Sequence, residues 1–257
     1  MSLSVKQAVI GGTGVYQLDN FDNIRLVSTE RISTGYGDVE VQIVDINGEL
    51  NAFICRHGSG HSVPPHKINY RANIRALKQL GVERVIATNA VGGIASDTGP
   101  GKLIVPDQII DYTWGRAHTF FDDFNSGVSH VDFTQPFSSR LVDSLRASMS
   151  ALNIDFTDGG VYGCVQGPRL ETAAEIRRYE NDGCTVVGMT VMPEAALVRE
   201  LEMEYASLCF SVNWAAGIPV DGKPAMIEWE EIKQNIEKCA ESLKKVLVRT
   251  LSESTRV

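Results

Sequence analysis

The stretch QAVIGGTG, residues 7–14, decides the type of fold, because an apolar run is followed at once by a glycine-rich turn. The run Gln7–Ile10 predicts a short buried strand, and the glycines predict a tight turn at its carboxyl end. Apolar runs of this kind recur along the chain, and segments with helical periodicity lie between the later ones. Strands that alternate with helices predict a largely parallel sheet that helices cover on both faces.

The other elements follow from the same patterns. Further strands are expected at Ile24–Val27, Val39–Val44, Leu50–Cys55, Arg84–Thr88, Ile104–Ile110, Gly160–Val165, Thr185–Val187 and Leu208–Asn213. Glycine turns are expected over residues 34–37 and at Asn89–Gly93. Helices are expected at Tyr70–Leu77 with Gly81 as the terminating glycine, at Ser139–Leu152, after the capping-box pattern at Thr172, around Pro193, and along Ile232–Leu247. We therefore expect one α/β domain, residues 1–257, with a twisted, mixed, largely parallel central sheet flanked by helices.

The composition is typical of a globular protein that folds without covalent cross-links. The 257 residues are 43% hydrophobic and 22% charged, and the net charge is −8. These values exclude a disordered, collagen-like or coiled-coil chain, and the acidic balance argues against a broad surface for nucleic acid or membrane. Five widely spaced cysteines include no C-x-x-C motif, so we expect neither a disulfide framework nor a zinc site. We see no signal peptide and no membrane-spanning run, and we expect a cytoplasmic protein.

Four loops at the carboxyl ends of predicted strands carry residues suited to an anion: residues 11–14, 56–61, 89–93 and 188–190. Ligands of parallel sheets bind beyond this edge, and the backbone N–H groups of glycine turns can close around phosphate. Each loop by itself is also compatible with ordinary turn chemistry. Four such loops at one edge together predict a phosphate pocket.

The second of these loops begins with Arg56, directly after a buried strand. An arginine in this position is either paired with an acidic side chain inside the protein or bound to an anion, because its guanidinium matches both carboxylate and phosphate. His57, His61 and His66 lie in the same loop, but no carboxylate or cysteine completes a metal shell with them. No metal site is therefore expected.

Two further polar residues stand at loop mouths. Glu171 precedes the expected N-cap Thr172, where a carboxylate either complements the helix dipole or accepts a hydrogen bond from a ring N–H of a ligand. Asn213 ends a predicted strand, and its amide both donates and accepts. From the residues alone, a structural and a ligand-binding role stay open for both.

Six segments keep the order of a known family between roughly residues 8 and 215: Val9–Gly14, Arg56–Gly58, Asn69–Asn73, Asn89–Gly93, Gln166–Arg169, and Gly188–Thr190 followed by Pro193-Glu194. With these segments the chain resembles the trimeric purine nucleoside phosphorylases, and within them the methylthioadenosine phosphorylase branch. The resemblance implies the nucleoside phosphorylase fold and a homotrimer. It also implies a nucleoside and inorganic phosphate as substrates, with no metal or organic cofactor.

The resemblance further implies roles for individual residues. The residues expected to hold phosphate are Thr13, Arg56, His57, Ala90 (through its amide) and Thr190. The residues expected to contact the nucleoside are Met189 under the ribose, Glu171 and Asn213 at the purine, and His61, Pro65 and His130 near the 5′ end, with His130 reaching in from a neighbouring subunit. Of these, Arg56, Glu171 and Asn213 are expected to carry the catalysis.

Two positions depart from the methylthioadenosine enzymes, which carry a serine at the position of Glu171 and an aspartate near that of Asn213. An ionised Glu171 can accept the N1–H of a 6-oxopurine, and the amide of Asn213 can bridge N7 and O6. A 6-aminopurine instead offers N1 as an acceptor, and hydrogen-bond mismatches of this kind discriminate by about 10⁴. We therefore expect a hypoxanthine-type nucleoside as substrate, with S-methyl-5′-thioinosine first.

Other functions stay open on the sequence. A general inosine or guanosine phosphorylase would share the purine contacts, and a methylthioadenosine phosphorylase would contradict the base-recognition hypothesis. A nucleotide- or NAD-binding regulatory module is disfavoured, because Gln17 stands where the G-x-G-x-x-G fingerprint requires glycine. A nucleoside hydrolase would have little use for an anion site at Thr13 and Arg56.

Overall fold

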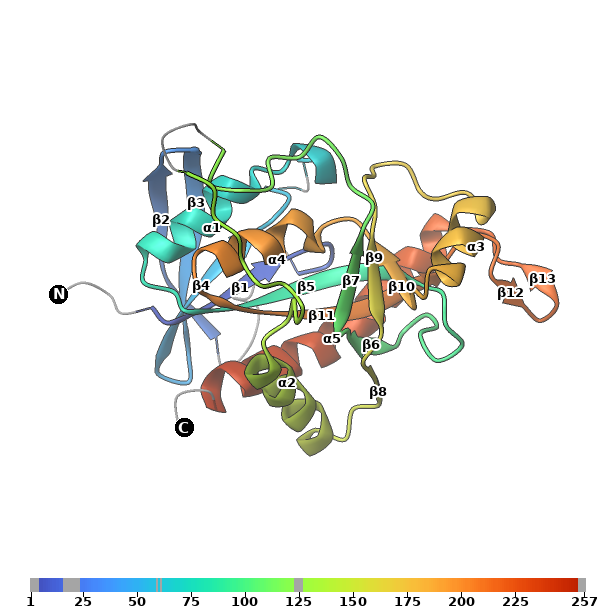
Figure 1. Ribbon diagram of the computed structural model, residues 1–257. Helices are drawn as coiled ribbons and strands as arrows, with labels where there is room; N and C mark the ends of the chain where they lie inside the picture. Colours follow the sequence, from blue (N-terminus) through green and yellow to red (C-terminus); the bar gives the residue numbers. More distant parts are fainter. Residues whose placement is uncertain (1–4, 16–23, 59, 61, 123–126, 254–257) are drawn as a thin grey trace.

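Strand β1 (Gln7–Gly11) runs through the middle of the sheet, parallel to β4 (Glu49–Cys55) on one side and to β5 (Arg84–Gly93) on the other. The computed structural model in Figure 1 describes residues 5–15, 24–58, 60, 62–122 and 127–253. Within these residues the main sheet has eleven strands. All five residues of β1 are buried, which confirms the prediction of a short buried strand before the glycine turn.

A long hairpin forms the edge of the sheet beyond β4. Its strands are β2 (Ile24–Thr34) and β3 (Gly37–Ile46), which pair with each other in antiparallel, and β3 also pairs in antiparallel with β4. Thr34 pairs with Gly37, so the predicted turn over residues 34–37 is confirmed. Both strands are longer than predicted, because β2 is mostly exposed and its polar side chains give little apolar signal.

Strand β5 exchanges one neighbour for another along its length. Residues 84–87 pair in parallel with β1, whereas Gly92 and Gly93 pair in antiparallel with β10 (Val186–Gly188). On its other edge, β5 pairs in parallel with β11 (Glu204–Trp214) from end to end. The prediction of a glycine turn at Asn89–Gly93 is therefore wrong, because β11 holds these residues in the sheet.

The remaining strands extend the sheet from β10 and β11. Strand β10 pairs in parallel with β9 (Val161–Cys164), which pairs in parallel with β7 (Gln108–Asp111). Strand β6 (Leu103–Val105) instead pairs with β11 and with β8 (Phe156–Asp158). The single strand predicted at Ile104–Ile110 is wrong, because Pro106 and Asp107 separate two strands that have different partners.

Helices cover both faces of the sheet, as predicted. Helices α1 (Tyr70–Gln79) and α4 (Val191–Glu200) pack against each other on one face, and α2 (Ser139–Ala151) and α5 (Trp229–Glu253) pack against each other on the other (Figure 1). The smaller elements are a 3₁₀ turn at Pro65–Lys67, α3 (Ala173–Asn181), and a hairpin of β12 (Pro219–Val220) and β13 (Lys223–Pro224). The architecture is thus one α/β domain with a mixed, largely parallel sheet flanked by helices. None of the helices in the described part of the chain is long and apolar enough to cross a membrane.

The predicted capping box at Thr172 is present and anchors the loop that carries Glu171. The Thr172 hydroxyl accepts from the Glu175 N–H at 3.2 Å, and the Glu175 carboxylate accepts from the Thr172 N–H at 2.8 Å. Arg169 adds a bidentate pair to Glu175 at 2.8 and 2.7 Å. The hydrogen bonds from Arg169 and the Thr172 N–H lower the pKa of Glu175 to about 2.

This reciprocal cap makes a testable difference between two helix starts. Thr172→Ala removes the hydroxyl from the capping box of α3, and a lost cap of about 1 kcal/mol lowers the midpoint of thermal unfolding by about 2–4 °C in a chain of this size. Ser138 caps α2 through one hydrogen bond, a longer contact of 3.4 Å from the Leu141 N–H. Ser138→Ala is therefore expected to lower the midpoint less. Differential scanning calorimetry measures the unfolding midpoint of both variants. An equal or larger decrease in Ser138→Ala contradicts the conclusion that the cap at Thr172 is the stronger one.

Candidate active site

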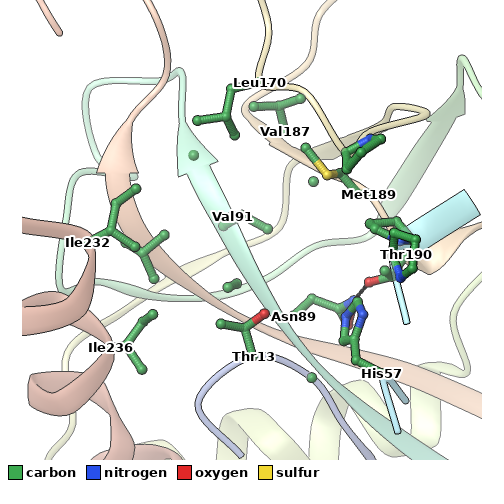
Figure 2. A pocket seen from close by; sticks show the side chains of 18 of the residues that line it. Thr13, His57, Asn89, Val91, Leu170, Val187, Met189, Thr190, Ile232 and Ile236 are labelled. Atoms are coloured by element: carbon green, nitrogen blue, oxygen red, sulfur yellow. Dashed lines mark hydrogen bonds between the residues drawn. The ribbon is translucent and has the colours of Figure 1, made fainter. Parts of the chain in front are cut away.

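A cavity of about 410 Å³ opens at the carboxyl ends of β1, β4, β5 and β11, beside the loop that follows β10 (Figure 2). The residues that line it are Gly12, Thr13, Arg56, His57, residues 62–65 and 89–92, Pro168, Leu170, Glu171, residues 187–190, Val212, Asn213, Trp229, Ile232 and Ile236. The four strand-end loops expected to meet at this edge all contribute to the lining. They do so from positions as far apart as residues 12 and 190.

Most of the residues expected at the site share this one cavity: Thr13, Arg56, His57, Pro65, Ala90, Glu171, Met189, Thr190 and Asn213. His61 lies outside the described residues. His130 does not line the cavity of its own chain and is exposed in the segment before α2, close to Val128, which is 84% exposed. The roles of all these residues stay predictions, and only their placement is established.

The exchange of neighbours along β5 creates the floor of the cavity. Strand β1 last pairs with β5 at Ala87, and β10 first pairs with it at Gly92, so this edge of β5 has no strand beside residues 88–91 in the described part of the chain. The Thr88 carbonyl points to this edge, where it accepts from Arg56. Residues two apart in a strand turn their peptide groups to the same side. The Ala90 N–H therefore faces the cavity.

Arg56 is held by a buried carboxylate at the edge of the cavity. Its Nε and Nη2 donate to the two oxygens of Glu194 at 2.7 and 2.9 Å, and the two side chains are 0% and 1% exposed. Its Nη1 donates to the Thr88 carbonyl at 3.0 Å. Burial lowers the pKa of Arg56, but attraction by Glu194 outweighs it and holds the pKa above its usual value. Arg56 is thus ion-paired inside the protein and also lines the cavity.

Gly12 is the residue that allows this approach. A Cβ at Gly12 would lie 2.7 Å from Arg56 Nη1 and 2.6 Å from the Thr88 carbonyl oxygen. Both distances are far inside ordinary contact, so only glycine leaves room for the guanidinium. The Gly12 N–H donates to the Thr88 hydroxyl at 3.1 Å, which fixes the turn so that Thr13 reaches the cavity.

Further donors complete the polar end of the cavity. The Thr190 hydroxyl accepts from Asn89 Nδ2 at 3.0 Å, which directs the hydroxyl hydrogen away from Asn89 and leaves it to donate to a ligand. Asn89 is held in turn by Ser207, whose hydroxyl donates to Asn89 Oδ1 at 3.2 Å. His57 donates from Nδ1 to the Val63 carbonyl at 2.8 Å, which fixes the orientation of the ring. We call Thr13, Arg56, His57, Ala90 and Thr190 the anion end.

These groups suit an anion better than a cation. Amides, hydroxyls and a guanidinium donate hydrogen bonds, as phosphate recognition requires, whereas metal ions need electron-pair donors. No cluster of three or more histidine, cysteine and acidic side chains that could hold a metal ion occurs in the described part of the chain.

Glu171 and Asn213 lie at another part of the same lining. Burial, followed by the like charge of Glu175, raises the pKa of Glu171 above its usual value of 4.5, and a hydrogen bond to its own backbone and the nearby Arg169 offset this only in part. Asn213 sits at a register shift near the end of β11, and its Nδ2 donates to the Trp214 carbonyl at 2.6 Å. This bond fixes the amide plane, so that the position of the Oδ1 acceptor is set before any ligand binds.

An apolar wall closes one side of the cavity. It consists of Trp229, Ile232 and Ile236 from the first turns of α5, and we call it the α5 wall. In Figure 2, Ile232 and Ile236 face His57 and Thr190 across the cavity. The sequence prediction assigned Ile232 and Ile236 to packing on the sheet. Both isoleucines do pack against the core, so the periodicity identifies the apolar face of α5 correctly, but it does not show that they also line a cavity.

Arg116 is a second buried arginine that the sequence analysis missed. It is 8% exposed and donates to the carbonyl oxygens of Val165 at 3.2 Å, Gln166 at 2.9 Å and Met189 at 2.8 Å. One side chain therefore ties the loop before Glu171 to the segment that carries Met189. Arg116 lies in a segment without regular secondary structure, where periodicity gives no signal.

A sequence profile of the Phosphorylase superfamily matches residues 6–252. The chain belongs to this superfamily. The match spans every strand of the main sheet and nearly all of α5, so the elements that build the cavity all fall within it.

Curated relatives match the phosphorylase chain over almost its whole length. It is 50% identical over 247 residues to a probable S-methyl-5′-thioinosine phosphorylase of Pseudomonas syringae, covering 96% of this chain and 98% of the relative. A protein of the same name from Xanthomonas campestris is 47% identical over 248 residues, covering 96% and 97%. The 6-oxopurine nucleoside phosphorylase of Pyrococcus furiosus is 44% identical over 249 residues, covering 95% and 91%.

Solved structures agree with this assignment. Methylthioadenosine phosphorylase from Schistosoma mansoni, in complex with adenine, superposes with a TM-score of 0.91 at 26% identity. The superposition covers 98% of this chain and 93% of that one. The nucleoside phosphorylase fold expected from the sequence is thus confirmed.

Proposed function

We propose that this phosphorylase cleaves the N-glycosidic bond of S-methyl-5′-thioinosine with inorganic phosphate, giving hypoxanthine and 5-methylthioribose 1-phosphate. The observation that carries the proposal is that an anion end, the Glu171–Asn213 pair and the apolar α5 wall line one cavity. The names of the curated relatives support the reaction and the 6-oxopurine class. The reaction makes the protein a pentosyltransferase in purine salvage.

Phosphate bound at the anion end would be the nucleophile. As the C1′–N9 bond breaks, its electrons go to the purine and positive charge develops on the ribose above Met189. Phosphate held by Arg56, Thr13, Thr190 and the Ala90 N–H faces this charge and then bonds to C1′. Catalysis of this kind works by positioning and electrostatic stabilisation, and it requires no covalent enzyme intermediate and no cofactor.

Glu171 and Asn213 would select the base. An ionised Glu171 accepts the N1–H of hypoxanthine. Asn213 accepts from N7 through Oδ1 once the departing purine takes up a proton there, and its amide hydrogens reach O6. The bond from Asn213 Nδ2 to the Trp214 carbonyl at 2.6 Å uses one of these hydrogens and leaves the other. Asn213 thereby stabilises the leaving group, and Glu171 supplies the discrimination against 6-aminopurines.

The α5 wall favours a methylthio group over a hydroxyl at the 5′ position. Trp229, Ile232 and Ile236 offer apolar surface, which a thioether covers favourably and which leaves a 5′-hydroxyl without a partner. A general inosine or guanosine phosphorylase is the second candidate, favoured by the name of the Pyrococcus relative. It differs from the first only at this wall.

We further propose a cytoplasmic homotrimer in which His130 and the apolar residues beside it cover the 5′ end of a neighbouring subunit's cavity. The exposure of Val128 and Val131, at 84% and 37%, and of Trp229, at 72%, supports a protein contact at both places. Pro65, which lines the cavity, is proposed to lie near the same end.

The direct test compares base release from methylthioinosine, inosine and methylthioadenosine, each with and without phosphate. We expect release only with phosphate, fastest for methylthioinosine and slowest for methylthioadenosine, measured by absorbance change or chromatography of the free base. If methylthioadenosine were the best substrate, the proposed phosphorolysis would stand and the role given to Glu171 would be wrong. Release that is equal without phosphate would overturn the reaction class.

The α5 wall is tested by the ratio of kcat/KM for methylthioinosine to that for inosine. Trp229→Ala is expected to lower this ratio about fivefold, because it removes roughly 1 kcal/mol of apolar burial from the methylthio group alone. Met226 is a matched control, since it is 79% exposed and does not line the cavity. Met226→Ala should leave the ratio unchanged. An unchanged ratio in Trp229→Ala would show that the 5′ group does not contact the α5 wall.

The raised pKa of Glu171 predicts a pH dependence of base selection. As the pH falls from about 7 towards 5, Glu171 takes up a proton earlier than an exposed carboxyl does and loses the acceptor for N1–H. Because protonated Glu171 donates to the N1 of a 6-aminopurine, the ratio of kcat/KM for methylthioinosine to that for methylthioadenosine should fall. Glu171→Gln cannot titrate, and its ratio should stay level over the same range. A ratio that does not change with pH in the unmodified protein contradicts the proposed contact between Glu171 and N1 of the purine.

A further inference from the structure

The pair of Arg56 and Glu194 gives the anion end an unusual electrostatic character. The two groups meet through two hydrogen bonds of 2.7 and 2.9 Å, and both side chains are shielded from water. Tyr205, on β11, donates a further hydrogen bond to Glu194 Oε1 at 2.8 Å. Burial and Glu194 together raise the pKa of Tyr205 well above its usual value, so the tyrosine is neutral and adds no charge.

The charge of Arg56 is therefore cancelled before any phosphate binds. Its hydrogen bonds are also largely used, because Nη1 donates to the Thr88 carbonyl at 3.0 Å and Nη2 to the Ile10 carbonyl at 3.4 Å. Of the other members of the anion end, Thr13, Ala90 and Thr190 carry no charge, and the His57 ring already donates from Nδ1 to the Val63 carbonyl. A site that needed only tight phosphate binding would gain from a free guanidinium, so the buried carboxylate works against phosphate affinity.

We propose that Glu194 is a positioning residue that fixes Arg56 at the anion end and cancels its charge. The negative charge of bound phosphate then stays available to stabilise the cationic ribose. This inference rests on the proposed phosphorolysis. In the transition state, the attraction between anionic phosphate and the cationic ribose lowers the barrier. An uncompensated arginine would bind phosphate more tightly in the ground state. It would also weaken the attraction between phosphate and the cationic ribose in the transition state, which raises the barrier.

The proposal predicts that two kinetic constants fall together. Glu194→Gln keeps the size of the side chain and an acceptor for Arg56 but removes the negative charge. We expect the KM for phosphate to fall about tenfold and kcat to fall by a similar factor, measured with saturating nucleoside. A residue that merely held Arg56 in place would give a higher KM for phosphate together with a lower kcat. The direction of the KM change therefore separates the two roles.

Two further variants separate charge from geometry. Glu194→Asp keeps the charge and shortens the side chain, so Arg56 shifts while staying neutralised, and the KM for phosphate should rise. Tyr205→Phe removes a hydrogen bond of Glu194 without changing any charge. It should lower thermal stability and leave the KM for phosphate within about twofold, since a buried hydrogen bond from a neutral donor contributes to stability and does not change the charge of the site.

Thermal unfolding with added phosphate gives a readout that does not depend on turnover. Removing one partner of a buried ion pair destabilises a protein strongly, because the other charge stays buried and unpaired. Phosphate would supply the missing countercharge, so it should raise the unfolding midpoint of Glu194→Gln more than that of the unmodified protein. A variant that stays unfolded at saturating phosphate, or gains no more from it than the unmodified protein, contradicts the proposal.

Failure of the inference differs from failure of the proposed function. Suppose that the unmodified protein releases base only with phosphate, and that Glu194→Gln shows a higher KM for phosphate. The proposed phosphorolysis is then supported, and the charge-cancelling role of Glu194 is wrong. If the unmodified protein shows no phosphate-dependent release, the proposed function itself falls.

Discussion

Strand β5 exchanges β1 for β10 between Ala87 and Gly92, and the cavity exists because of this exchange. A strand that kept one neighbour along this edge would have its peptide groups paired throughout. Here β11 holds the opposite edge of β5 in the sheet, so residues 88–91 stay extended while one edge opens. The loops after β1, β4 and β10 then converge on the opening. The strands and the first turns of α5 that surround the opening give a ligand a site that is formed in advance.

A second constraint is that the charged groups at this opening have little contact with water, since Arg56 and Glu194 are fully buried and Glu171 is partly buried. Arg56 and Glu194 are buried together, and Glu171 is buried enough to raise its pKa. Water would weaken each of these electrostatic effects, so the cover supplied by α5 matters for the polar chemistry as well as for apolar contact. The same helix stabilises the sheet through β11 and α2. Stability and chemistry therefore share one element.

Much of this architecture could be predicted from the sequence because strands, glycine turns and caps leave local signals. The run before Gly11, the turn at residues 34–37 and the capping box at Thr172 are examples, and the four strand-end segments indicated where the cavity lies. Prediction failed at Asn89–Gly93 and at residues 104–110, where pairing with distant strands decides the structure. Glu194 as the partner of Arg56, and Ile232 as part of a cavity wall, also depend on tertiary contacts. No local pattern shows which buried acid meets which buried base.

The separation of Arg56 from Glu194 along the chain, 138 residues, has a consequence for how the protein is made. During synthesis the first five strands emerge long before α4, and until then Arg56 has no carboxylate to meet. A buried, unpaired guanidinium is strongly unfavourable, so the amino-terminal half cannot settle into its final packing alone. The Asn89 side chain likewise lacks its hydrogen-bond partners until Thr190 and Ser207 have been synthesised. A fragment ending before α4 would therefore be an open, incompletely packed chain, and the final structure forms as one cooperative unit once the carboxyl-terminal half has joined it.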